Sequence, residues 1–153
     1  MTRYSVVIVG FVIAFLIFAC ACNKKQEKID YKANENVEYE LGIPYQKEIT
    51  NLKKGMLAYQ KMADCPYSEE DVNQVGVILD EYFEQMEKST SKEKGLLIVQ
   101  TTVEKFNALN QKCDLELIST SERDIIATIL IRVNCEKGYG KCDEDITEEW
   151  RDW

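Results

Sequence analysis

Apolar residues recur every three or four positions along four segments of the chain, the spacing that places them on one face of an α-helix. Polar and charged residues fill the positions between them, as expected for helices with one face in water. The segments begin near Pro44, Ser68, Thr90 and Ser119. The apolar positions are Ile49, Leu52, Met56, Tyr59 and Ala63; Val72, Val75, Leu79, Tyr82 and Met86; Leu96, Val99, Val103, Phe106, Leu109 and Cys113; and Ile125, Ile126, Ile129, Leu130 and Val133.

Short polar sequences before three of these segments are typical helix starts. Residues 68–71 follow Pro66 and place three acids in the first turn, where they favour the helix dipole. Residues 90–93 and 119–122 each have the spacing of a capping box. Because short connectors make neighbouring helices antiparallel, the sequence predicts an all-α, up-down-up-down four-helix bundle over residues 43–153.

The N-terminus has a different pattern, an unbroken apolar run from Val6 to Ala19. A single positive charge, Arg3, precedes the run, and the next charged residue is Lys24. A short positive region followed by an apolar region is typical of an export signal. We therefore expect a hydrophobic signal or anchor helix over residues 1–22 and a polar tether over residues 23–42, with the bundle domain after them.

The end of the apolar run resembles the lipobox of bacterial lipoproteins, in which an aliphatic, a variable and a small residue precede the cysteine that receives the lipid. Residues 17–20 (Ile-Phe-Ala-Cys) and 19–22 (Ala-Cys-Ala-Cys) both fit this pattern. The aliphatic residue favours Cys20, whereas cysteine parity favours Cys22, because cleavage before Cys22 leaves four other cysteines. We prefer Cys22 and keep Cys20 as the alternative.

The lipobox resemblance implies a palmitate-containing lipid anchor and a domain held in the cell envelope, facing the periplasm or the cell exterior. The residue after either cysteine is Ala21 or Asn23 rather than aspartate, which in a Gram-negative host resembles sorting to the outer membrane. The alternative is an uncleaved transmembrane anchor, since residues 4–23 are 20 uncharged residues and about 20 span a bilayer. Both interpretations tether the rest of the chain to a membrane.

Charge and composition exclude several classes of function. The chain has 19 basic and 27 acidic residues and no histidine, giving a net charge of −8, which becomes −9 once the signal with Arg3 is removed. Without histidine, Ser-His-Asp and Cys-His catalysis and histidine-ligated metals are excluded. The acid excess argues against a nucleic-acid partner, which requires a basic surface.

Four cysteines follow the signal: Cys65, Cys113, Cys135 and Cys142. No C-x-x-C pair and no histidine is available for zinc, and export favours disulfides. In the expected bundle, Cys65 follows the first helix and Cys113 ends the third, so both lie at one end. This arrangement predicts the pairs Cys65–Cys113 and Cys135–Cys142, with buried reduced thiols as the alternative.

Two aromatic residues near the C-terminus are candidates for contact with a partner. Tyr139 lies between two glycines in the loop between Cys135 and Cys142, and a rigid aromatic residue on such a loop loses little entropy on binding. Trp153 is expected to cover the core or to contact a partner. Ile146 and Trp150 are four residues apart, a spacing that favours packing of a short turn onto the bundle.

Five acids lie within the seven residues 143–149, but the EF-hand spacing is absent, so no metal ion or other cofactor is expected. No phosphate-binding, dinucleotide-binding or G-x-S-x-G motif occurs, and no catalytic residue is assigned. The sequence favours a non-enzymatic acidic binding module, such as an inhibitor or immunity-type protein for a basic envelope protein. A structural envelope component and a carboxylate-based envelope hydrolase are the alternatives.

Two stretches in the last third of the chain, residues 117–125 and 145–153, resemble a family of small uncharacterised bacterial proteins. That resemblance implies no activity and no functional residue.

Overall fold

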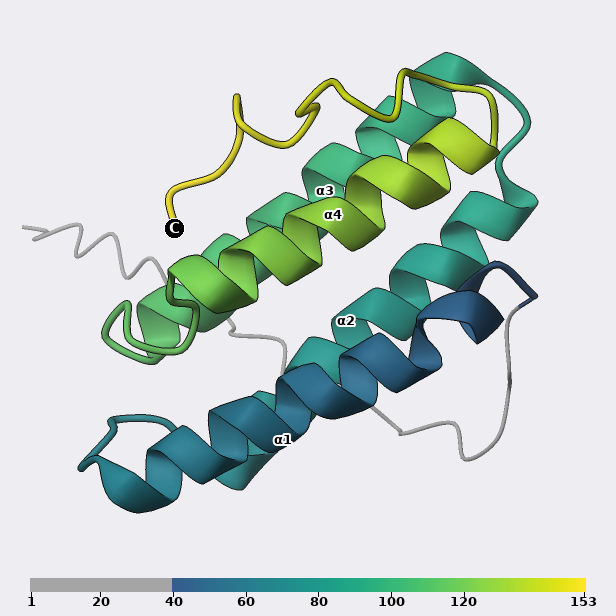
Figure 1. The fold of residues 1–153 in the computed structure, drawn as a ribbon. Helices are drawn as coiled ribbons and strands as arrows, with labels where there is room; N and C mark the ends of the chain where they lie inside the picture. Colours follow the sequence, from purple (N-terminus) through teal and green to yellow (C-terminus); the bar gives the residue numbers. More distant parts are fainter. Residues whose placement is uncertain (1–39) are drawn as a thin grey trace, which may run out of the picture. The chain divides into compact units, whose positions relative to one another are not determined.

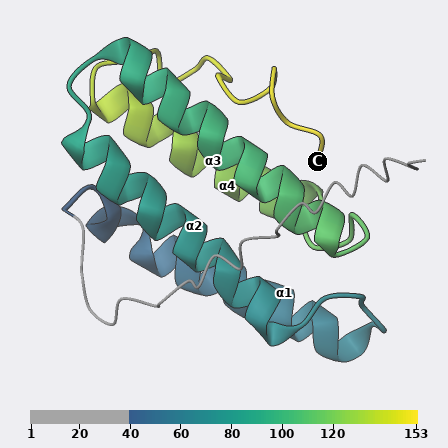
Figure 2. The ribbon, with the colours of Figure 1, turned by 180° about the vertical axis from the view of Figure 1, so that it is seen from behind.

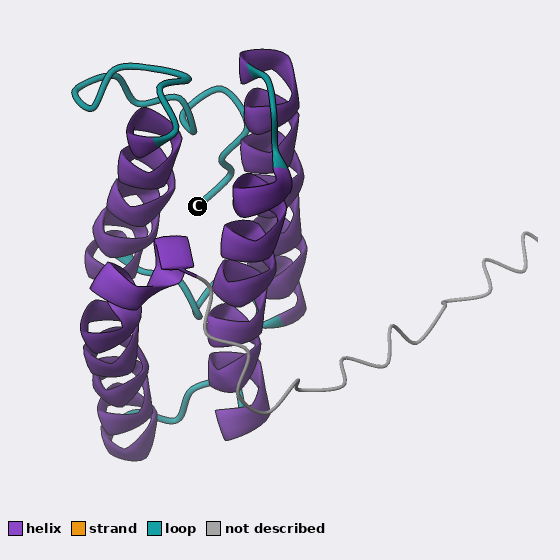
Figure 3. Cartoon of the chain, turned by 90° about the vertical axis from the view of Figure 1, so that its right-hand side faces the viewer, coloured by secondary structure: helices purple, strands orange, loops and turns teal. Residues whose placement is uncertain are grey.

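The computed structural model describes residues 40–153. The expected signal peptide, the two candidate lipid-bearing cysteines Cys20 and Cys22, and residues 23–39 of the expected tether lie outside the described residues. Residues 40–42, which the sequence assigns to the tether, belong instead to a helix packed on the bundle. Over residues 40–153 the chain is all-helical and has no strand (Figure 3). A 3₁₀ helix, η1 (Glu40–Tyr45), is followed by four α-helices: α1 (Gln46–Met62), α2 (Glu69–Lys88), α3 (Lys92–Lys112) and α4 (Thr120–Glu136).

The four helices pack as a bundle in which successive helices run in opposite directions (Figures 1 and 2). Each helix contacts the next one along the chain, and α4 also contacts α1 and α2. The helix η1 packs against α1 and α2 at the end of the bundle where α2 finishes. The strand-free fold with four helices confirms the predicted class.

Local capping chemistry explains where the helices begin. Ser68 and Asp71 form a reciprocal capping box at the start of α2, and Ser119 and Glu122 form another at the start of α4. The predicted start of the third helix is displaced by one residue. Its N-cap is Ser91, whose hydroxyl accepts a hydrogen bond from the Lys94 backbone N–H at 3.3 Å.

The core is built from most of the apolar positions predicted above and includes the fully buried aromatic residues Tyr82, Phe83 and Phe106. The predicted core positions Tyr59 and Leu96 are wrong, because Tyr59 is 57% exposed and Leu96 lies outside the core cluster. The Tyr82 hydroxyl donates a hydrogen bond to the Leu130 carbonyl at 2.8 Å, which joins α2 to α4 inside the core. Burial raises the pKa of Tyr82, so the hydroxyl stays protonated and remains a donor.

The cysteines follow the prediction only in part. Cys135 and Cys142 form a disulfide with Cα atoms 5.2 Å apart, as predicted. The predicted Cys65–Cys113 bond is wrong in this structure, where both residues are free thiols. The two cysteines do lie at the same end of the bundle. Lys112, which precedes Cys113, contacts Asp71 in the first turn of α2, shortly after Cys65, at 2.5 Å. However, a disulfide also requires the two Cβ atoms to approach within about 4.5 Å, and a shared end of the bundle does not ensure that approach.

Candidate binding groove

The segment after α4 turns back and runs along the bundle (Figure 1). We call residues 143–153 the C-terminal tail. Ile146, Trp150 and Trp153 pack against the core cluster, and Thr147 is completely buried. The predicted packing of Ile146 and Trp150 onto the bundle is therefore confirmed.

Asn107 fixes the tail against α3. Its side-chain N–H donates a hydrogen bond to the Trp150 carbonyl at 2.8 Å, and its side-chain oxygen accepts one from the Asp152 N–H at 3.5 Å. Because these bonds satisfy backbone groups of the tail, the tail can lie on the helix without a regular helix or strand of its own.

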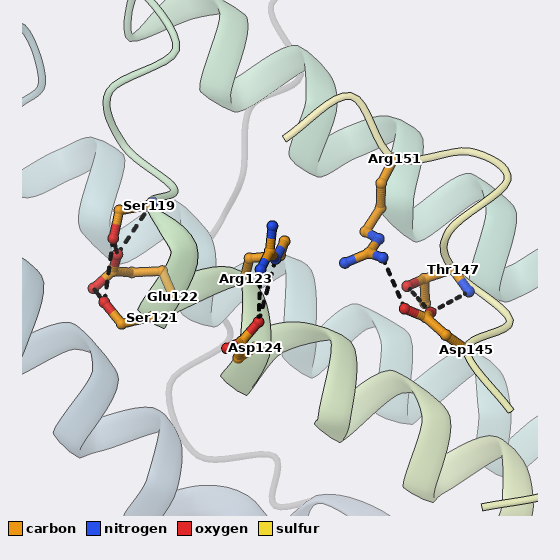
Figure 4. Close-up of polar contacts among 8 residues, drawn as sticks. All are labelled: Ser119, Ser121, Glu122, Arg123, Asp124, Asp145, Thr147 and Arg151. Atoms are coloured by element: carbon orange, nitrogen blue, oxygen red, sulfur yellow. Dashed lines mark hydrogen bonds and ion pairs between the residues drawn. The ribbon is translucent and has the colours of Figure 1, made fainter. Parts of the chain in front are cut away.

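A tight turn within the tail is organised by Asp145 (Figure 4). Its carboxylate accepts hydrogen bonds from the backbone N–H and the hydroxyl of Thr147 at 2.9 and 2.6 Å, and from Arg151 at 2.7 Å. Burial raises the pKa of Asp145, but the bonds from Thr147 and the charge of Arg151 outweigh burial and lower it overall. Asp145 is therefore held in its charged form.

Between the tail and the first half of α3 lies a groove of about 600 Å³. Its lining contains apolar side chains from both α3 and the tail, and Leu97 is 60% exposed although it is a large apolar residue. Four carboxylates also line the groove, and no lysine or arginine is among the lining residues. The lining residues are Glu93, Leu96, Leu97 and Gln100 from α3, and Glu144, Asp145, Ile146, Glu149 and Trp150 from the tail.

The groove carries negative charge on both walls. Glu93 lies in the first turn of α3 and is fully exposed. Hydrogen bonds from its own backbone N–H and from Ser91 lower its pKa. Asp145 on the opposite wall is charged too, but Arg151 offsets its charge. The negative charge that can attract a cation to the groove therefore comes from Glu93, Glu144 and Glu149.

Tyr139, which was expected to contact a partner, lies half-buried outside the groove. Its hydroxyl donates a hydrogen bond to the Ser89 carbonyl at 2.9 Å and accepts one from the Ser89 hydroxyl at 3.2 Å. Its ring lies so close to Gly95 that a Cβ there would be 2.3 Å from a ring carbon. Tyr139 therefore fastens the loop of residues 137–142 to the turn between α2 and α3.

Trp153, the other expected contact residue, is also half-buried and does not line the groove. It meets the ring of Phe106 edge-on at 6.1 Å, and the Arg151 guanidinium lies 5.5 Å from its ring centre. Its buried indole N–H has no hydrogen-bond partner among the described residues. Its position fits the alternative in which Trp153 covers the core.

Leu96, Leu97 and Trp150 are not predicted from the sequence as groove residues. Leu96 belongs to the predicted apolar face but lies half-buried in the groove, and its neighbour Leu97 lies off that face, which was the available signal. Trp150 was assigned only to packing, although in the structure it both packs on the core and lines the groove.

A second depression, of about 640 Å³, lies at the opposite end of α3. Its apolar lining includes Tyr59 and Leu115, which are 57% and 51% exposed. Leu115 and its neighbour Asp114 have positive φ angles of 64° and 52°. The charged residues that line this depression are Glu116 and Glu122 alone, so it has a weaker charge pattern than the groove beside the tail.

Within residues 40–153, no three cysteine, aspartate or glutamate side chains are grouped so that they could hold a metal ion. Among the same residues, no helix has both the length and the apolar character needed to cross a membrane.

In comparisons with protein families, curated proteins and solved structures, nothing matches this chain. The resemblances to lipoprotein signals and to a family of small bacterial proteins therefore stay predictions.

Proposed function

We propose that this chain is a non-enzymatic acidic binding module that takes a basic segment of another protein into the groove between α3 and the C-terminal tail. The observation that carries the proposal is a groove lined by apolar side chains and four carboxylates, of which Asp145 is paired with Arg151. In this proposal an N-terminal lipid on Cys22, or on Cys20, tethers the module to the envelope membrane. An inhibitor or immunity-type role toward a basic envelope protein fits such a module.

The groove fits a segment that carries an apolar side chain between lysines or arginines. The apolar side chain would cover Leu97 and Trp150 and gain the free energy of burial. The flanking cations would meet Glu93 on one wall and Glu149 on the other. Because exposed charges mainly steer encounter and are screened by salt, this mode predicts fast, salt-sensitive association.

The carboxylate-hydrolase alternative has less support. A general acid at neutral pH needs a carboxyl group whose pKa is raised towards 7. In this groove the pKa values of Glu93 and Asp145 are shifted the other way, by hydrogen bonds and, for Asp145, by Arg151. Groups that stay charged suit attraction of a cation better than donation of a proton.

The test uses the full chain in a non-ionic detergent and a short synthetic peptide with one leucine flanked by lysines. In a Trp153→Phe background, Trp150 is the remaining tryptophan and reports directly on the groove. We expect the peptide to change Trp150 fluorescence, with an affinity that falls as ionic strength rises. A peptide with glutamates in place of the lysines should not bind, and equal binding of both peptides would contradict the proposal.

A charge variant localises the site. Glu93→Gln with Glu149→Gln removes one carboxylate from each wall and should weaken binding severalfold, since both carboxylates are exposed and contacts between exposed charges are individually weak. Glu69→Gln with Glu70→Gln is the matched control, because it removes the same charge from the exposed first turn of α2, outside the groove. Equal weakening by both double variants would mean that net charge, and not the groove, binds the peptide.

A further inference from the structure

One wall of the groove is attached to the bundle at its start by the Cys135–Cys142 disulfide. Cys135 lies in the last turn of α4, and Cys142 immediately precedes the C-terminal tail. The bond closes a loop that spans a sequence separation of seven residues. Glu144, which lines the groove, is two residues beyond it.

Between the disulfide and the docked part of the tail, little else holds the chain. The side chains of Asp143 and Glu144 make no hydrogen bond or ion pair with α1, α2, α3 or α4 in the described structure. The next residue that packs on the core is Ile146. The position of Glu144 is therefore set by two attachments, Ile146 on one side and the disulfide on the other.

Besides the disulfide, the loop is attached to the end of α2 and the start of α3 through Tyr139 and Lys137. Tyr139 is bonded to Ser89 and its ring covers Gly95, two residues after the groove residue Glu93. Lys137 adds a bond to the Glu87 carbonyl at 3.3 Å. These contacts are few and half-exposed, so they are of the kind that open locally when a covalent restraint is removed.

We propose that the Cys135–Cys142 disulfide controls the groove, so that the oxidised chain is the high-affinity form and the reduced chain a weaker one. This inference rests on the proposed function of the groove. Reduction by a dithiol transfers two electrons and two protons to the S–S bond. It yields the two cysteine thiols, and the dithiol becomes its own cyclic disulfide.

We expect reduction to weaken binding only partly, because the two halves of the wall formed by the tail are attached to the bundle differently. Ile146 and Trp150 stay packed on the core, and Asn107 still binds the Trp150 carbonyl. Asp145 stays bonded to Thr147 and Arg151. Residues 137–144 gain freedom, so a bound partner must order Glu144 again. Loss of this preorganisation weakens binding about tenfold. The lost contact is electrostatic, so the salt dependence of the remaining binding becomes shallower.

The experiment measures binding of the lysine–leucine peptide to the full chain in non-ionic detergent, before and after reduction with dithiothreitol. We expect about tenfold weaker binding after reduction, with a smaller salt dependence and recovery on reoxidation. Cys135→Ser with Cys142→Ser should bind as the reduced protein does and should not respond to the reductant. Cys65→Ser is the matched control, because Cys65 is already a free thiol, and it should respond as the unmodified chain does.

A structural measurement keeps the test decisive if the double serine variant does not fold. Amide hydrogen exchange on reduction should accelerate at residues 137–144 and stay unchanged in α2 and α3. If the oxidised chain fails to bind the peptide, the proposed function fails and this inference fails with it. If the oxidised and reduced chains bind equally, or exchange is unchanged at residues 137–144, the redox control alone is wrong.

Discussion

Asp71 joins two elements through a single carboxylate. It closes the capping box of α2 with Ser68, and it meets Lys112 at the end of α3 at 2.5 Å. Burial raises the pKa of Asp71, but hydrogen bonds from Lys112 and Ser68 outweigh burial and lower it overall. Since the Lys112 side chain is 65% exposed, solvent screens much of its contribution, and the cap accounts for most of the stabilisation.

Replacement of Asp71 by asparagine should therefore destabilise the domain by about 1–2 kcal/mol at neutral pH. A lowered folded-state pKa means that this stabilisation is present above the unfolded pKa of about 4 and is lost as pH falls through the folded value. Urea unfolding of both chains should accordingly show a difference that shrinks below about pH 4. A difference that stays constant into strong acid would show that the charge of Asp71 is not responsible.

At the scale of elements, the loop of residues 137–142 depends on a glycine in the first turn of α3. A Cβ at Gly95 would lie 2.3 Å from the Tyr139 ring, whereas a Cβ at Gly55 in α1 would meet no atom within 4 Å. The same substitution should consequently act in opposite directions at these two positions.

We expect Gly95→Ala to displace Tyr139 and to cost about 1–3 kcal/mol through overpacking. Gly55→Ala should stabilise the domain by up to about 1 kcal/mol, because alanine has the higher helix propensity. Thermal unfolding of the two variants beside the unmodified chain checks both signs. Equal effects would mean that helix propensity alone decides the outcome and that Tyr139 does not hold the loop.

The helices could be predicted from sequence because their signals are local. Capping residues at Ser68 and Ser119 and the three-to-four spacing of the core positions lie within the elements that they define. At the third helix, Thr90 and Ser91 are both suitable N-caps, and only the chain path selects Ser91. The short-range disulfide was predictable for the same reason, since its cysteines are seven residues apart.

The groove could be predicted only in part, because it is formed by long-range contacts. The acids of the tail were visible in the sequence, but their placement opposite Glu93 depends on Asn107, which binds the tail from 43 residues away. Leu97 lies off the predicted apolar face of its helix, so nothing local connects it with Trp150. The prediction of a Cys65–Cys113 disulfide is wrong for the same reason. A shared end of the bundle does not determine whether two side chains separated by many residues approach each other.

For the molecule as a whole, the proposed lipid anchor determines where the groove can work. Metabolic labelling with a palmitate analogue should mark the chain, and Cys22→Ala should abolish the label while Cys20→Ala retains it. Intact mass of the mature chain should correspond to cleavage before Cys22. Label that persists in Cys22→Ala and disappears in Cys20→Ala would assign the lipid to Cys20, and an unlabelled chain of full mass would favour the uncleaved anchor.

The short helix η1 has a mechanical consequence, because any tension on the N-terminal segment enters the described domain at Glu40. The Leu41 N–H donates to Glu87 at the end of α2, at 3.2 Å, and the Tyr45 hydroxyl donates to Glu136 at the end of α4, at 2.7 Å. A pull on residue 40 is therefore shared by two helices rather than applied to α1 alone. Both attachments lie at the end of the bundle where α3 begins. A pulling force would therefore act first on the part of the bundle next to the groove.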